Sequence, residues 1–208
     1  MNMMNRFPIA AVRTLLGVGV PLMLASAARA EEATGGNSGF PAGQPPEYLH
    51  VLLHPVLIVG LGVALVALLA GLLSRSKAAQ IIALCLVLGS SLAAWPVLKL
   101  GQSAYNRVRP QADEAGKAWA REHMRRAETF VYVFYGTALL ATAGLLTHRK
   151  FAKAVMPLTI ATLVAGAASL GGGGWISKAG GQIRHPEFRD SPPPIAMPPD
   201  HSHSPSKP

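Results

Sequence analysis

Four long uncharged apolar runs dominate the pattern of hydrophobic and polar positions along this chain. They cover residues 51–73, 78–98, 129–147 and 154–176. Each run has about 20 residues, which is the length that a tilted helix needs to cross a bilayer. Because unpaired backbone groups are too costly in lipid, such runs must be helical. The pattern therefore predicts four membrane-spanning helices.

Short basic links join the first run to the second and the third run to the fourth. Residues 74–77 read Ser-Arg-Ser-Lys, and residues 148–153 read His-Arg-Lys-Phe-Ala-Lys. Short connections make neighbouring helices antiparallel, so the expected fold is an all-α membrane bundle of four helices in two hairpins. Gly171–Gly174 followed by Trp175 predicts that the fourth helix ends there.

A longer loop, residues 101–128, connects the two hairpins and contains an amphipathic helical stretch at 112–128. Trp119, His123 and Arg126 recur on one face at helical spacing. We expect this stretch either to lie against the membrane or to run straight into the third helix. The four-helix domain then spans residues 48–188.

Both ends of the chain differ from this domain. Residues 1–30 resemble a secretory signal, with Arg6 and Arg13 before a short apolar region at 15–25 and a small-x-small pattern that ends at Ala30. We expect cleavage after Ala30, although an uncleaved anchor remains an alternative. Residues 31–47 are rich in glycine and proline and predict a flexible linker, while the proline-rich residues 189–208 predict a disordered tail.

The signal predicts the orientation in the membrane. It delivers the next segment outside the cytoplasm, so the two short basic links are expected on the cytoplasmic side, as the positive-inside rule requires. Both mature termini are then periplasmic in a bacterial inner membrane. The loop at 101–128 also carries many basic residues, which leaves the opposite orientation open.

Composition agrees with a membrane protein and argues against nucleic acid as a partner. Only 14% of residues are charged and 50% are hydrophobic, against about 25% charged residues in soluble domains. The net charge of +9 comes from basic residues that flank the apolar runs, which suits phospholipid head groups. No basic patch with interleaved aromatic residues is present. The expected partners are the lipid bilayer and other membrane or redox proteins.

Histidines and carboxylates gather at one membrane face under this topology. Neutral imidazole binds haem iron, copper or zinc, and carboxylates complete such ligand sets. The predicted ligands of haem b are His54, His123 and His185. A transition metal would use His50, His54, His123, His185, Glu122 and Glu187. One alternative is that each histidine sits at the head-group boundary, hydrogen-bonded to a loop. Another is a site that handles protons or anions.

His50 and His54 are four residues apart, so one helix would place both on one face. If the helix instead begins at Pro55, His54 caps it and His50 lies outside it. His148 falls at the opposite membrane face.

Catalytic signatures are missing from the sequence. There is no nucleophile elbow, no His-Glu-x-x-His and no Cys-x-x-Cys-His haem attachment. A bound haem must therefore be held without covalent attachment. We expect a binding role rather than an enzymatic one.

The order of these features resembles the bacterial membrane family known as "domain of unknown function 2231". The resemblance covers about residues 50–188 and rests on His54-Pro55 at the first helix and on Gly180-Gly-Gln-Ile-Arg-His185-Pro-Glu187 after the fourth. Members commonly carry a second His followed by Phe-Pro four residues after the proline, where this chain has Val59-Gly-Leu61. The resemblance implies a four-helix membrane fold and an association with cytochrome or redox modules.

Three functions agree with these observations. The first is a redox-associated membrane protein that binds haem b or a metal. The second is a component that assembles or stabilises other membrane proteins without a cofactor. A small transporter is the third, and it is the least supported because no charged residue falls at mid-membrane in any of the four runs.

Overall fold

The computed structural model describes residues 44–194 of the chain. The expected signal peptide, most of the expected linker and the end of the tail lie outside these residues. Every regular element between residues 44 and 194 is helical. The predicted all-helical fold is therefore confirmed for this part of the chain.

Five α-helices and two short 3₁₀ turns make up the described fold. Their bounds are α3 Pro46–Leu73, α4 Lys77–Leu92, α5 Ala94–Val108, η3 Arg109–Gln111, α6 Glu114–Lys150, α7 Ala152–Arg184 and η4 Pro186–Phe188. Since α4, α5 and η3 continue one another, the chain forms four helical arms that are long and apolar enough to cross a membrane. Four such arms were predicted from the apolar runs.

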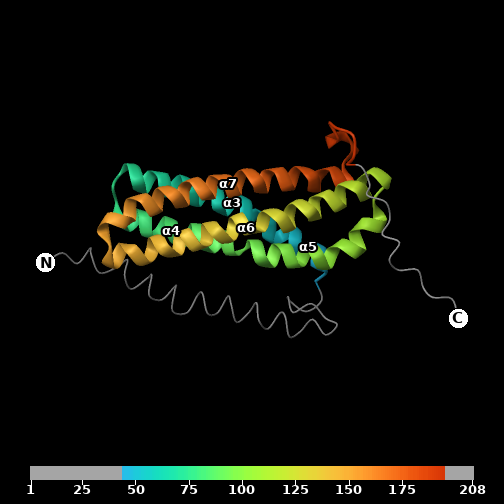
Figure 1. Ribbon diagram of the computed structural model, residues 1–208. Helices are drawn as coiled ribbons and strands as arrows, with labels where there is room; N and C mark the ends of the chain where they lie inside the picture. Colours follow the sequence, from blue (N-terminus) through green and yellow to red (C-terminus); the bar gives the residue numbers. More distant parts are fainter. Residues whose placement is uncertain (1–43, 195–208) are drawn as a thin grey trace.

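The four arms form an elongated bundle of two hairpins (Figure 1). α3 packs against α4, α5 and α7, and α6 packs against the same three helices. α3 and α6 therefore face each other across the diagonal of the bundle. The two short links, residues 74–76 and Phe151, lie at one end of the bundle. We call the other end, where α3 begins and α7 finishes, the histidine end.

The helices extend further toward the histidine end than the apolar runs predicted. α6 begins at Glu114, so the amphipathic stretch of the loop runs straight into the third arm, which was one of two expectations. The Asp113 side chain caps this helix by accepting a hydrogen bond from the Gly116 backbone N–H at 2.7 Å. The histidine end is therefore built from helices rather than from loops.

The predicted end of the fourth helix at Gly171–Gly174 was wrong, because α7 continues to Arg184. Two of these glycines lie at helix contacts. A Cβ atom at Gly172 would collide with the Phe130 ring, and one at Gly173 would collide with Ile58. Small residues let helices approach closely, so this run is used for packing rather than for termination.

A bend separates α4 from α5 in the second arm. α4 ends at Leu92 and α5 begins at Ala94. Pro96 follows in the first turn of α5 and has no backbone N–H to donate to the carbonyl of Leu92. On both sides of this break the second arm stays packed between α3 and α6, since α4 and α5 each contact both helices.

Many large hydrophobic side chains lie on the outer surface of the bundle as well as in its core. On α3, Leu61 and Leu68 are fully buried, whereas Val63 is 61% exposed and Val66 is 70% exposed. A long helix that is hydrophobic on all sides needs apolar surroundings on all sides. The exposed valines agree with a helix that is long and apolar enough to cross a membrane.

Candidate functional site

Three histidines come together at the histidine end of the bundle. The ring centroids of His50 and His54 are 5.8 Å apart, and those of His50 and His123 are 6.3 Å apart. α3 begins at Pro46, so Pro55 lies inside the helix and His50 and His54 lie one turn apart on it, with their ring planes tilted by 37°. Of the two helix starts considered from the sequence, the earlier one is therefore correct.

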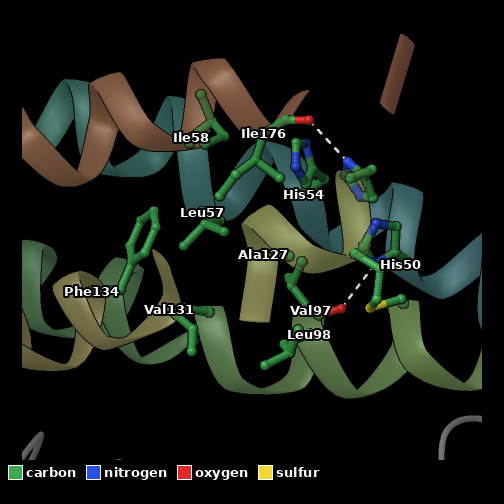
Figure 2. Close-up of a pocket in the computed structure, with 15 residues that line it drawn as sticks. His50, His54, Leu57, Ile58, Val97, Leu98, Ala127, Val131, Phe134 and Ile176 are labelled. Atoms are coloured by element: carbon green, nitrogen blue, oxygen red, sulfur yellow. Dashed lines mark hydrogen bonds between the residues drawn. The ribbon is translucent and has the colours of Figure 1, made fainter. Parts of the chain in front are cut away.

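Two of the histidines are oriented by helix backbone. His50 Nδ1 lies 2.8 Å from the carbonyl oxygen of Val97, and His123 Nδ1 lies 2.9 Å from that of Ile176. Figure 2 shows both hydrogen bonds as dashed lines. A carbonyl oxygen only accepts, so Nδ1 carries the proton in both rings. The neutral form of each ring then has its lone pair on Nε2.

A glycine lies one turn beyond each accepting carbonyl and makes room for the ring. A Cβ atom at Gly101 would be 3.1 Å from Cε1 of His50, and one at Gly180 would be 3.1 Å from Cε1 of His123. The two hairpins thus repeat one arrangement. In each hairpin, a histidine on the first helix of the hairpin lies over a glycine on its second helix. The histidine donates a hydrogen bond to the backbone carbonyl four residues before that glycine.

The repeated arrangement has a sequence signature. Val97-Leu-Lys-Leu-Gly101 and Ile176-Ser-Lys-Ala-Gly180 share the pattern Val/Ile-x-Lys-x-Gly. Our reading of the sequence missed it, although a comparison of the two hairpins would have found it. The signal is short, and its meaning depends on histidines that lie far away in the chain.

His54 is held less firmly than the other two. Its Nε2 atom lies 3.5 Å from Ser177 Oγ, which is long for a hydrogen bond. The Ser177 hydroxyl donates instead to the carbonyl of Gly173 at 2.8 Å. His54 therefore keeps more rotational freedom than His50 and His123.

All three histidines line two cavities. The larger one has a volume of about 500 Å³, within the range of about 300–1,000 Å³ that is usual for ligand pockets. The smaller one, of about 50 Å³, is lined mainly by apolar side chains, including Leu57, Val131 and Phe134 (Figure 2). Further polar or sulfur-bearing residues of the larger cavity, which our sequence reading did not select as ligands, are Glu47, Tyr105, Arg109, Met124, Ser177 and Arg184.

Residues 44–194 contain no group of three or more histidine, cysteine, aspartate or glutamate side chains placed to hold a bare metal ion. Zinc and similar ions take three or four protein ligands. Haem iron needs only one or two axial imidazoles, because the porphyrin supplies its other four nitrogen ligands. The histidine pair therefore fits haem better than it fits a bare ion.

Three other residues of the predicted ligand set have partners of their own. Glu122 accepts hydrogen bonds from Arg125 and Arg126, each at 2.7 Å. His185 Nδ1 lies 2.9 Å from Glu187 Oε1, and its exposed ring stacks on Phe188 with centroids 4.9 Å apart. None of the three lines either cavity. The structure thus brings together His50, His54 and His123 and places His185, Glu122 and Glu187 elsewhere.

An ion pair fastens the chain after α7 to the start of α6. Arg189 donates to both carboxylate oxygens of Asp113, at 2.7 and 2.9 Å, and also to the carbonyl of Ile183. The hydrogen bonds from Arg189, followed by the one from the Gly116 backbone, lower the pKa of Asp113. This contact holds the two helix ends beside the larger cavity.

Comparisons with known protein families, with curated proteins and with solved structures found no match for this chain. The resemblance to the "domain of unknown function 2231" family therefore stays a prediction.

Proposed function

We propose that this chain is a multi-pass membrane protein that binds haem b without covalent attachment and serves redox partners in the membrane. His50 and His123 would hold the haem iron, with His54 beside them. Bound haem would supply one-electron chemistry, while the protein controls its ligation, solvent access and orientation.

The observation that carries this proposal is the pair of hydrogen bonds from His50 and His123 to backbone carbonyls. Metal-bound histidines almost always donate their other ring N–H to a carboxylate, a carbonyl or water, because this bond holds the ring and raises its basicity. Here the donors are Nδ1 atoms, at 2.8 and 2.9 Å from their acceptors. Both Nε2 atoms are left to act as ligands. A histidine that merely lies at the head-group boundary can hydrogen-bond to water and does not require a glycine beneath its ring.

An absorption spectrum tests the proposal. The full chain, purified in detergent and given haem b, should develop the sharp Soret band of histidine-ligated iron. His50→Ala and His123→Ala should each shift or abolish that band. His148→Ala and His185→Ala are matched controls, because neither residue lines either of the two cavities described above. A wild-type spectrum identical to that of free haem in detergent, or four variants that behave alike, would refute the proposal.

We also propose that the protein lies in a bacterial inner membrane with the histidine end on the periplasmic side. The short basic links at the opposite end support this orientation. Ser74→Cys and Ser191→Cys, each in a chain with Cys85 replaced, place a thiol at either end of the bundle. A membrane-impermeant thiol reagent should label residue 191 in intact spheroplasts and leave residue 74 unlabelled. The reverse pattern would show the opposite orientation.

A second candidate function is the assembly of other membrane proteins without a cofactor. It is favoured by exposed small residues along one side of α7, namely Ala167, Ala168, Gly171 and Gly174. Such faces let membrane helices pack closely. If this function is correct, Gly171→Leu should abolish cross-linking to neighbouring proteins in native membranes, and the purified wild type should show no Soret band with haem.

A further inference from the structure

Two arginines line the larger cavity together with the histidines. Arg109 opens η3 after α5, and Arg184 is the last residue of α7. Arg184 lies eight residues beyond Ile176, the acceptor for His123, which is roughly 12 Å along the helix. The arginines therefore belong to the part of the cavity that is nearest the end of the bundle.

Neither arginine forms a direct ion pair with a carboxylate of residues 44–194. The charge of Arg109 is attracted to that of Glu114, but without an ion-pair contact. Arg109 is half-buried, and its Nε atom is buried without a hydrogen-bond partner among residues 44–194. Its guanidinium lies 5.9 Å from the Tyr105 ring centroid. Arg184 donates to the neutral side chain of Gln111 at 2.8 Å. A buried guanidinium nitrogen without a partner is costly, and a ligand that accepts its hydrogen bond would remove that cost.

The opposing charge in this cavity is Glu47. Its Oε2 atom is also buried, with no hydrogen-bond partner in the described part of the chain. Two arginines against one carboxylate leave the cavity lining with a net positive charge. The rest of the lining is mostly apolar, with Val51, Pro55 and Ala104 among its residues.

We propose that the larger cavity binds a flat, largely apolar macrocycle that carries carboxylates, and that Arg109 and Arg184 bind those carboxylates while the apolar walls bind the ring. This inference rests on the proposed function for the identity of the ligand, whose carboxylates are then the propionates of haem. It adds the specificity of the site: the free acid is selected over an uncharged ester of the same ring.

The test measures binding of metal-free protoporphyrin IX and of its dimethyl ester to the full-length protein in detergent, from porphyrin fluorescence. Because neither compound contains iron, histidine ligation does not contribute. The affinity ratio of acid to ester is compared between variants, so that partition of the porphyrins into micelles cancels. The wild type should prefer the acid by at least about tenfold relative to the double variant Arg109→Gln/Arg184→Gln, as expected for charged hydrogen bonds.

Two further variants sharpen the comparison. Arg107→Gln removes an exposed arginine of the same arm that does not line the cavity, and its acid-to-ester ratio should match that of the wild type. Glu47→Gln removes the opposing carboxylate and should raise the ratio. If the double variant does not fold, the single Arg184→Gln serves instead, because this side chain is exposed at the helix end.

The outcomes separate this inference from the proposed function. An acid-to-ester ratio that is the same in the wild type and the double variant overturns the arginine assignment even if haem binds with a histidine-ligated spectrum. An arginine-dependent preference for the acid supports it. If that preference occurs while haem never acquires a histidine-ligated Soret band, the inference stands and the proposed iron ligation fails.

Discussion

The rings of His50 and His123 meet with centroids 6.3 Å apart and planes at 85°, although the two residues belong to different hairpins. Their helices, α3 and α6, face each other across the diagonal of the bundle. Each ring reaches the interior because a glycine on the neighbouring arm leaves room for it, and a carbonyl on that arm holds it. The hydrogen bond and the glycine contact of each ring can therefore be tested separately, without any ligand.

The tautomers of the two histidines are the most direct test. We expect His50 and His123 to carry the proton on Nδ1, because only a carbonyl oxygen lies beside that atom. Long-range nitrogen–proton NMR of the histidine-labelled protein in detergent distinguishes the tautomers. His50→Gln and His123→Gln assign the signals. A neutral ring protonated on Nε2 at either position would contradict the described hydrogen bonds.

Gly180 should tolerate alanine less well than Gly174 on the same helix. A methyl group at Gly180 comes within 3.1 Å of the His123 ring, whereas one at Gly174 meets nothing within 4 Å. Loss of the hydrogen bond to Ile176 should cost about 1 kcal/mol, which would appear as a lower thermal midpoint for Gly180→Ala. Gly174→Ala should leave the midpoint unchanged or raise it, because alanine favours helix. Equal midpoints would show that the glycine does not make room for the ring.

Gly172 and Gly171 form a second matched pair, which tests the packing of α6 against α7. A Cβ atom at Gly172 collides with the Phe130 ring, while one at Gly171 meets nothing within 4 Å. Overpacking of this kind typically costs about 1–3 kcal/mol. Gly172→Ala should therefore lower the thermal midpoint clearly, and Gly171→Ala should not. If both variants unfold at the same temperature as the wild type, α6 and α7 do not pack as described.

The ion pair between Asp113 and Arg189 should make stability depend on pH in the acid range. The pKa of Asp113 is lowered in the folded protein, chiefly by its hydrogen bonds from Arg189. Its stabilising contribution is therefore complete above the unfolded value of about 3.9 and is lost as the pH falls through the lower folded pKa. The wild-type thermal midpoint should fall in that window.

The control for this prediction is Asp113→Asn, which keeps a side-chain oxygen to cap α6 but removes the titrating group. The pH dependence in this window should be smaller for the variant than for the wild type. Asp190 and Glu187 also have lowered pKa values and contribute to the dependence that remains. Identical pH profiles for the two proteins would show that the pair with Arg189 does not contribute.

Local signals in the sequence misled wherever a residue type serves two purposes. Glycine both ends helices and lets them pack closely, so Gly171–Gly174 predicted a helix end inside what is one continuous helix. Proline opens helices and is also tolerated within membrane arms, so Pro55 could not decide where α3 begins. In each case the neighbouring helix determines which role applies.

The sequence alone determined the four helical arms and the two hairpins, because the length of an apolar run and the shortness of a link depend on neighbouring residues only. It also placed the histidines near helix ends. Only the tertiary structure decided that His50 joins His123 while His185 pairs with Glu187. That choice depends on which helices are diagonal, on how far each extends beyond its apolar run, and on glycines in a neighbouring arm. These are distances between residues far apart in the chain, and no local pattern specifies them.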